Sequence, residues 1–125
     1  RKDRKAYFLD PFMYSVFKGY SFGVYKEYID EDKIIEGIVC ESLKRLCKVR
    51  SDADKFLFFY KNKKETDFVF KSNNLIGIEV KNGKAERRDF KNYLVFKEKI
   101  LLNKSVLNYN DNLLICPYSL FLAIL

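Results

Sequence analysis

Two short apolar segments on either side of a polar turn constrain the fold of this chain more than any other feature. The segments are Thr66–Phe70 and Leu75–Val80, and Ser72-Asn73-Asn74 separates them. Apolar runs of this length, bounded by residues that favour turns, predict two neighbouring β-strands. A chain with such a pair near its centre is expected to build a sheet, and the rest of the sequence has to cover it.

The flanking sequence predicts more strands and several helices. Asp10-Pro11 is typical of a helix start, and this helix is expected to run to about Lys18 and end at Gly19. Apolar residues recur at spacings of three and four from Asp32 to about Lys48, which predicts a second helix. The order of the elements predicts an α/β domain with a central sheet. Further strands are expected at Phe56–Tyr60, Ser105–Tyr109 and Leu113–Cys116, a basic helix at Glu86–Lys99 and a last helix at Tyr118–Leu125.

The chain of 125 residues is long enough for one domain and too short for two. Residues 1–28 are expected to form a linker and an N-terminal helical extension, and residues 29–125 the α/β core. The basic opening, which begins with Arg1, predicts that the chain is part of a larger protein. The sequence has no signal peptide and no apolar run as long as a membrane span, so we expect a cytoplasmic protein without a membrane partner.

The composition narrows the chemistry that this chain can perform. A net charge of +7 favours a polyanionic partner such as nucleic acid, although a lysine-rich chain can also be basic for solubility alone. Three cysteines without CxxC spacing point to a reduced intracellular protein. The absence of histidine excludes Ser-His and Cys-His catalysis and His-ligated zinc within this chain. Metal chemistry would therefore need oxygen ligands, which selects Mg²⁺ or Mn²⁺.

Three charged residues lie at the ends of the two central strands. Asp67 stands at the start of the first strand, and Glu79 and Lys81 stand at the end of the second. If the strands pair, these side chains converge at one edge of the sheet, as a metal-dependent phosphodiesterase requires. Strand alternation places Glu79 and Lys81 on one face, and it places Asp67 with Glu65 and opposite Thr66. The alternative is that these are charges on the solvated face of a sheet.

A fourth acidic residue, Glu36, lies within the apolar stripe of the helix predicted over residues 32–48. On a helical wheel it falls between Val39 and Cys40. A carboxylate on the packed face of a helix is costly unless a cation or hydrogen bonds compensate its charge. Glu36 is therefore expected to meet a metal ion or Lys81. The alternative is a residue at the fringe of the first turn, where a negative charge suits the helix dipole.

In chain order, Glu36, Asp67, Glu79 and Lys81 resemble the core of the PD-(D/E)XK nuclease superfamily. More closely, the chain is similar to the C-terminal domain of prokaryotic AAA-type ATPases that end in such a nuclease-like module. Thr66 departs from the superfamily pattern, because proline often stands at this position before the aspartate. The segments that carry the resemblance are Arg4–Pro11, Ile35–Leu43, Lys64–Val69, Ile78–Lys81 and Pro117–Leu122.

The resemblance implies a restriction-endonuclease-like mixed sheet flanked by helices, and a nuclease that acts on nucleic acid, DNA in particular. It implies that Asp67 and Glu79, with the backbone carbonyl of Val80, hold Mg²⁺ or Mn²⁺ and that Glu36 completes the ligand shell. Lys81 would orient the attacking water. The expected partners also include an upstream ATPase region in the same polypeptide, and self-association into a homo-oligomer is considered as well.

Four basic residues, Lys84, Arg87, Arg88 and Lys91, follow the second central strand and are expected to contact phosphates that flank the cleaved bond. The alternative is an ordinary solvated helix face. Three other functions compete with the nuclease. They are a catalytically silent module that binds nucleic acid or a protein partner, a structural interaction domain, and an RNA-recognition sheet, which the order of helices and strands disfavours.

Overall fold

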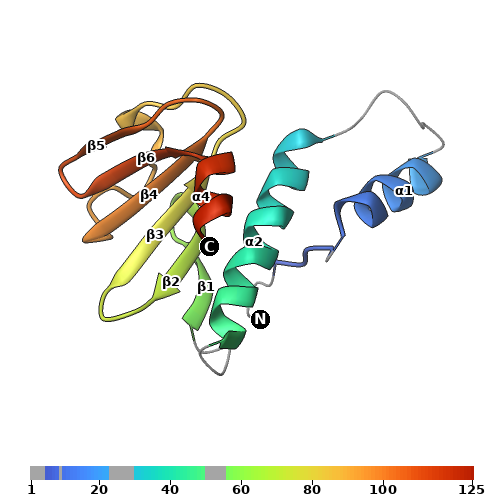
Figure 1. The fold of residues 1–125 in the computed structure, drawn as a ribbon, viewed down its shortest axis with the longest axis horizontal. Helices are drawn as coiled ribbons and strands as arrows, with labels where there is room; N and C mark the ends of the chain where they lie inside the picture. The colour runs from blue at the N-terminus through green and yellow to red at the C-terminus, as the bar shows by residue number, and fades with distance from the viewer. Residues whose placement is uncertain (1–4, 9, 23–29, 50–55) are drawn as a thin grey trace.

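The computed structural model describes residues 5–8, 10–22, 30–49 and 56–125, and it confirms the expected α/β class. Within these residues, three helices flank a six-stranded mixed sheet (Figure 1). The expected boundary between an N-terminal extension and a core at residues 28–29 lies outside the described residues. The elements are α1 (Pro11–Phe22), α2 (Glu31–Val49), β1 (Leu57–Lys61), β2 (Glu65–Lys71), β3 (Leu75–Val80), the 3-10 helix η1 (Arg87–Asp89), β4 (Glu98–Asn103), β5 (Asn108–Asn110), β6 (Leu113–Pro117) and α4 (Tyr118–Ile124).

The sheet has the strand order β1-β2-β3-β4-β6-β5. The first three strands form an antiparallel meander, as the polar turn between the two central segments predicted. Strands β3, β4 and β6 then run parallel, and β5 pairs antiparallel with β6. Strand β3 therefore stands at the change from antiparallel to parallel pairing, and its C-terminal end carries Glu79 and Val80.

Helices α2 and α4 cover one face of the sheet (Figure 1). Val39 and Leu43 of α2 and Phe121 of α4 are buried in one cluster with side chains of β2, β3, β4 and β6. The apolar stripe predicted for residues 32–48 is confirmed, because its three- and four-residue spacing turns every apolar side chain to the sheet. Burial of each such side chain stabilises the fold by about 1.5–3 kcal/mol. The packing of α2 on the sheet thus fixes the position of Glu36 relative to the strands.

The opposite face of the sheet is covered by residues 85–96, where a basic helix over Glu86–Lys99 was expected. That prediction is wrong: η1 and turns lead directly into β4. Phe90 and Phe96 are both buried on this face, in one cluster with Val69. Six residues apart on a helix, they would point about 120° apart. An irregular backbone lets both rings pack on the sheet, and Phe96 lies directly over Gly77.

The C-terminal strands also differ from the expectation at one point. The strand predicted at Ser105–Tyr109 is displaced, because β4 occupies Glu98–Asn103 and a short β5 begins at Asn108. The carboxamide of Asn103 shapes the turn between them: its Oδ1 accepts the backbone N–H groups of Ser105 and Val106 at 2.8 and 2.6 Å.

Helix α1 begins where Asp10 caps it, with Oδ1 accepting the N–H of Phe12 at 2.8 Å, and it continues past the expected end at Lys18. Along the described parts of the chain, no helix combines the length and the apolar character needed to cross a membrane.

Candidate functional site

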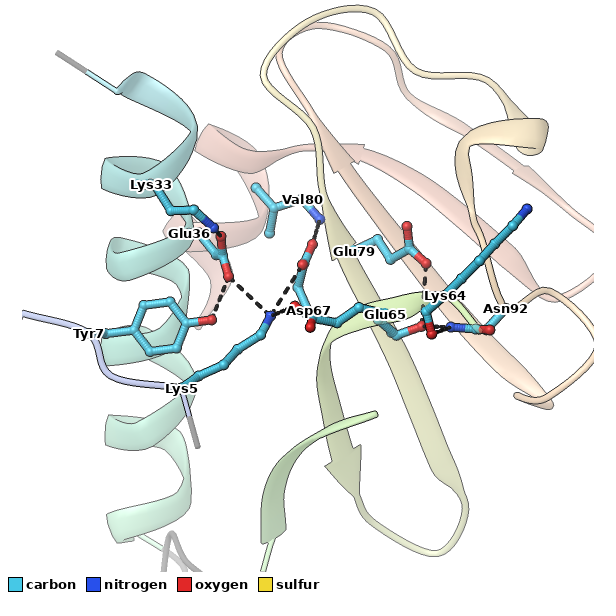
Figure 2. A network of polar contacts seen from close by, with 11 residues as sticks. Lys5, Tyr7, Lys33, Glu36, Lys64, Glu65, Asp67, Glu79, Val80 and Asn92 are labelled. Atoms are coloured by element: carbon cyan, nitrogen blue, oxygen red, sulfur yellow. Dashed lines mark hydrogen bonds and ion pairs between the residues drawn. The ribbon is translucent and has the colours of Figure 1, made fainter. Parts of the chain in front are cut away.

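A β-bulge in β2 sets the direction of the Asp67 side chain. Phe58 of β1 pairs with Val69, and Tyr60 pairs with Thr66, so β2 contains one more residue than β1 between these pairs. Such a bulge interrupts the alternation of side chains and often lies beside a functional site. Asp67 consequently points toward α2, where its carboxylate lies near Lys5 and Glu36 (Figure 2).

The bulge overturns the expected distribution of faces. Asp67 and Glu79 were expected to converge, but the Thr66 hydroxyl, on the side opposite Asp67, donates to Oε1 of Glu79 at 3.3 Å. Thr66 and Glu79 therefore share one side of the sheet, and Asp67 reaches toward the other. Strand alternation fails here because the extra residue in β2 changes which side chains point to the same face.

Four charged side chains from three separate segments meet on the α2 side. The ammonium group of Lys5 lies 2.6 Å from Glu65, 3.3 Å from Glu36 and 3.5 Å from Asp67. Burial alone would lower the pKa of Lys5, but the hydrogen bond to Glu65 and the charges of Asp67 and Glu36 outweigh burial and raise it. Lys5 is therefore a cation held at the centre of three carboxylates (Figure 2).

Glu36 is buried, with a relative exposure of 6%, and it is fully compensated. The hydroxyl of Tyr7 donates to its Oε1, and the ammonium of Lys33 lies 2.7 Å from its Oε2. Burial would raise the pKa of Glu36, but Lys33, Tyr7 and Lys5 together lower it below its ordinary value. Glu36 thus has positive partners, as expected, but they are Lys5 and Lys33 and not Lys81.

Glu79 is more deeply buried, with a relative exposure of 1%. Its Oε1 accepts the backbone N–H of Lys91 at 2.9 Å and the hydroxyl of Thr66. Asn92 in turn donates to the Thr66 oxygen at 2.7 Å. Burial raises the pKa of Glu79, and the negative charge of Asp67 raises it further, against the effect of the Lys91 hydrogen bond. The neighbouring positive charge therefore does not offset the cost of burying the ionised Glu79 carboxylate.

Asp67 lies between the acidic group around Lys5 and the buried Glu79. Its Oδ2 accepts the backbone N–H of Val80 at 3.0 Å, directly beside Glu79 on β3 (Figure 2). Burial raises the pKa of Asp67; the Val80 hydrogen bond acts against this, and the charge of Glu36 adds to it. Glu36, Asp67 and Val80 thus lie together on the α2 side, and Glu79 lies beyond Val80 with Thr66.

Lys81 follows Val80, and its backbone N–H donates to the carbonyl of Leu102 at 2.8 Å. This bond extends the β3–β4 pairing by one residue, so the start of the Lys81 side chain is fixed relative to Glu79. The side chain is partly buried. The role expected of Lys81 stays a prediction, because the described contact comes from its backbone.

The donor atoms of Glu36, Asp67, Glu79 and the Val80 carbonyl are all oxygens, which is the donor set that Mg²⁺ and Mn²⁺ prefer. Across residues 5–8, 10–22, 30–49 and 56–125, no three acidic, cysteine or histidine side chains are grouped closely enough to hold a metal ion as they stand. A lysine ammonium occupies the centre of the acidic group instead. The residues fit a divalent ion by the chemistry of their donor atoms, but binding would require Lys5 to move and Glu79 to turn toward Asp67.

The four basic residues that were expected to contact phosphates differ in their exposure and in the partners that they already have. Arg87 pairs with Asp111 at 2.6 Å and lies 4.4 Å from the ring of Tyr93. Arg88 pairs with Glu86 at 3.0 Å. Lys91 contributes its backbone N–H to Glu79. Lys84 is exposed and lines a cavity of about 400 Å³ together with Arg87.

Sequence reasoning missed three members of the site: Lys5, Tyr7 and Glu65. Lys5 and Tyr7 are two residues apart, so their side chains lie on one side of an extended segment. This spacing is the sequence feature that could have indicated that the two act together. It could not reveal their target, because Lys5 and Glu36 are 31 positions apart in the sequence.

Comparison with known families gives one match. A family model described as "Domain of unknown function (DUF4143)" matches residues 31–117, from the start of α2 to the end of β6. Searches of curated proteins and of solved structures return no significant match. The matched region includes Glu36, Asp67, Glu79 and Lys81, and it begins after Lys5 and Tyr7.

Proposed function

Since this chain belongs to the DUF4143 family, a domain found in C-terminal regions associated with AAA ATPases, we propose that it is a metal-dependent phosphodiesterase module with a restriction-endonuclease-like fold. Its substrate is nucleic acid, DNA in particular. The observation that carries the proposal is that two carboxylates, the partly buried Asp67 and the buried Glu79, lie on either side of Val80. The pKa of each is raised, first by burial, so a divalent cation beside them would stabilise their ionised forms.

The proposed roles follow from the placement of each residue. Asp67, Glu79 and the Val80 carbonyl would hold Mg²⁺ or Mn²⁺, with Glu36 as a further oxygen donor. The ion, when bound, would supply Lewis-acid activation of the phosphate and of a water. Lys81 would orient the attacking water and stabilise negative charge on a phosphate oxygen, because it follows the metal-binding strand directly. Tyr7 and Lys33 would hold the Glu36 carboxylate in place.

Substrate binding would depend on positive charge near this edge of the sheet. Lys84 is exposed, and Arg87 becomes available only if its contact with Asp111 opens. Contacts of this kind position a phosphate backbone without reading its sequence. The net charge of +7 supports attraction to a polyanion.

The test is cleavage of labelled duplex, single-stranded and branched DNA, and of RNA, in the presence of Mg²⁺ or Mn²⁺. Asp67→Asn and Lys81→Ala are each expected to lower the cleavage rate roughly 100-fold or more. Lys104→Ala removes the same charge as Lys81→Ala from an exposed position and serves as the matched control. Equal rates for Lys81→Ala and Lys104→Ala, or cleavage that continues in excess chelator, would contradict the proposal.

A second candidate function is a catalytically silent module that binds nucleic acid or a protein partner. Two observations favour it: Lys5 already occupies the centre of the acidic group, and Glu79 already accepts two hydrogen bonds. This candidate predicts binding of labelled DNA, measured by fluorescence anisotropy, with an affinity that neither Mg²⁺ nor Lys81→Ala changes. The cleavage assay and the binding assay together separate the two functions.

A further inference from the structure

Lys5 occupies the point at which the carboxylates of the proposed site converge. Its ammonium contacts Glu36 and Asp67, which are two of the proposed metal ligands, and Glu65, which is not. A lysine ammonium carries one positive charge and binds the same carboxylate oxygens that a divalent ion would bind, although at longer distances. Lys5 and a divalent ion would therefore compete for the same oxygen atoms.

The segment that carries Lys5 is anchored by aromatic contacts as well as by ion pairs. The ring of Phe8 lies 5.8 Å from that of Tyr14 and 5.5 Å from that of Phe17, and the ammonium of Lys5 lies 5.7 Å from the centre of the Phe59 ring. Residues 5–8 run past α2 before α1 begins (Figure 1). Beyond the ion pairs of Lys5, Tyr7 donates to Glu36 and its ring lies 5.7 Å from that of Phe68. These contacts hold the segment against the site from one side.

Two cavities border this segment. One cavity of about 380 Å³ is lined by Lys5, Tyr7 and Asp67, among others, and a second of about 220 Å³ by Lys5, Tyr7 and Glu36. The segment therefore borders open space, while Tyr7 packs against the core cluster and Phe8 against α1.

We propose that Lys5 is a tethered counter-ion that fills the acidic site while no metal is bound, and that the Lys5–Phe8 segment is an autoinhibitory strap that must withdraw before a divalent ion can bind. This inference rests on the proposed metal-dependent function. Withdrawal of Lys5 would remove its positive charge from between the carboxylates of Glu36, Glu65 and Asp67. The oxygen atoms of these carboxylates would then be open to a divalent ion. Any movement of this segment would thereby control the metal affinity of the site.

The test is titration calorimetry of Mn²⁺ into the full chain. Lys5→Gln removes the competing charge and is expected to bind Mn²⁺ roughly ten-fold more tightly than wild type. Lys5→Arg keeps the charge and is expected to bind no more tightly than wild type. Lys18→Gln is the matched control, because Lys18 also takes part in an ion pair, with Asp30 at 3.8 Å, but on α1.

Glu65→Gln gives a second test that does not depend on how Lys5→Gln folds. The contact between Lys5 and Glu65 is the shortest of the three ion pairs. Its loss should release Lys5 and tighten Mn²⁺ binding, although the variant has lost an acidic charge. A site governed only by the sum of nearby charges would bind Mn²⁺ more weakly after the same change.

The outcomes separate the strap from the proposed function. If wild type binds Mn²⁺ and neither Lys5→Gln nor Glu65→Gln binds it more tightly, the strap is refuted and the metal site remains. If no folded variant and no wild-type protein binds Mn²⁺, the proposed metal-dependent function fails, and the strap fails with it. Weaker binding by Lys5→Gln would show that Lys5 supports the site, which also overturns the inference.

Discussion

The carboxylate of Asp67 accepts a hydrogen bond from the backbone N–H of Val80, with 3.0 Å between Oδ2 and N. The backbone pairing of β2 with β3 runs from Lys71–Leu75 to Phe68–Ile78. Immediately beyond the last backbone pair, the Asp67 carboxylate accepts the Val80 N–H. Within the paired strands a backbone carbonyl is the acceptor of such an N–H. The side chain of Asp67 thus ties β2 to β3 just beyond their last backbone pair, and Asp67 is one of the proposed metal ligands.

The hydrogen bond predicts different effects of two substitutions at position 67. Asp67→Asn keeps an oxygen that can accept from Val80, whereas Asp67→Ala leaves a partly buried N–H without its acceptor. We expect Asp67→Ala to lower the free energy of unfolding by about 1–3 kcal/mol more than Asp67→Asn does. Urea denaturation of the two variants measures the difference. Equal stabilities would show that the Val80 contact contributes nothing.

Glu79 predicts a dependence of stability on pH. Its pKa in the folded chain is raised above the ordinary value of 4.5, so the folded state holds a proton that the unfolded state has already lost. The stabilisation is present below pH 4.5 and is lost as the pH rises through the folded pKa, at about 1.4 kcal/mol per pKa unit. Glu79→Gln, which cannot ionise, should therefore gain stability relative to wild type as the pH increases.

Denaturation of wild type and Glu79→Gln at a series of pH values, without metal, checks this expectation. Glu36→Gln is the informative comparison. The pKa of Glu36 is lowered, so its ionised carboxylate stabilises the fold at pH values above the ordinary pKa of 4.5. Its stability difference from wild type should shrink as the pH falls. A difference for Glu79→Gln that does not change with pH would contradict the raised pKa.

Tyr7 and Glu36 are expected to be energetically coupled. Tyr7→Phe removes the hydroxyl that donates to the buried Glu36 carboxylate, while the ring can keep its contact with Phe68. The loss of a hydrogen bond to a charged group should cost about 1.5–3 kcal/mol. In a double-mutant cycle with Glu36→Gln, the two effects should be non-additive. Additive effects would mean that the two side chains act independently.

Gly77 and Gly37 form a matched pair for testing the packing. A Cβ at position 77 would lie 2.6 Å from Cδ2 of Phe96, whereas at position 37 its nearest neighbour would be the carbonyl of Phe8 at 3.9 Å. Gly77→Ala is therefore expected to destabilise the fold by about 1–3 kcal/mol through overpacking. Gly37→Ala, in the interior of α2, should stabilise it by up to about 1 kcal/mol. Thermal melts of both variants test the opposite signs.

The sequence alone determined the features that depend on local periodicity. The three- and four-residue spacing over residues 32–48 predicted α2 and the buried position of Glu36. The apolar runs and the polar turn between them predicted β2 and β3, with the bounds of β3 at Leu75 and Val80. These inferences hold because each residue's environment repeats with the geometry of its own element.

Only the tertiary structure decided the features that depend on partners distant in the sequence. The pairing with β1 produced the bulge that turned Asp67 toward α2 and moved Thr66 to the side of Glu79. Packing on Gly77 replaced the expected basic helix by an irregular segment that brings Phe90 and Phe96 onto the sheet. Lys5 entered the site from a segment outside the predicted core. No local pattern encodes such contacts, because their free energy arises only when separate segments bury their surfaces against each other.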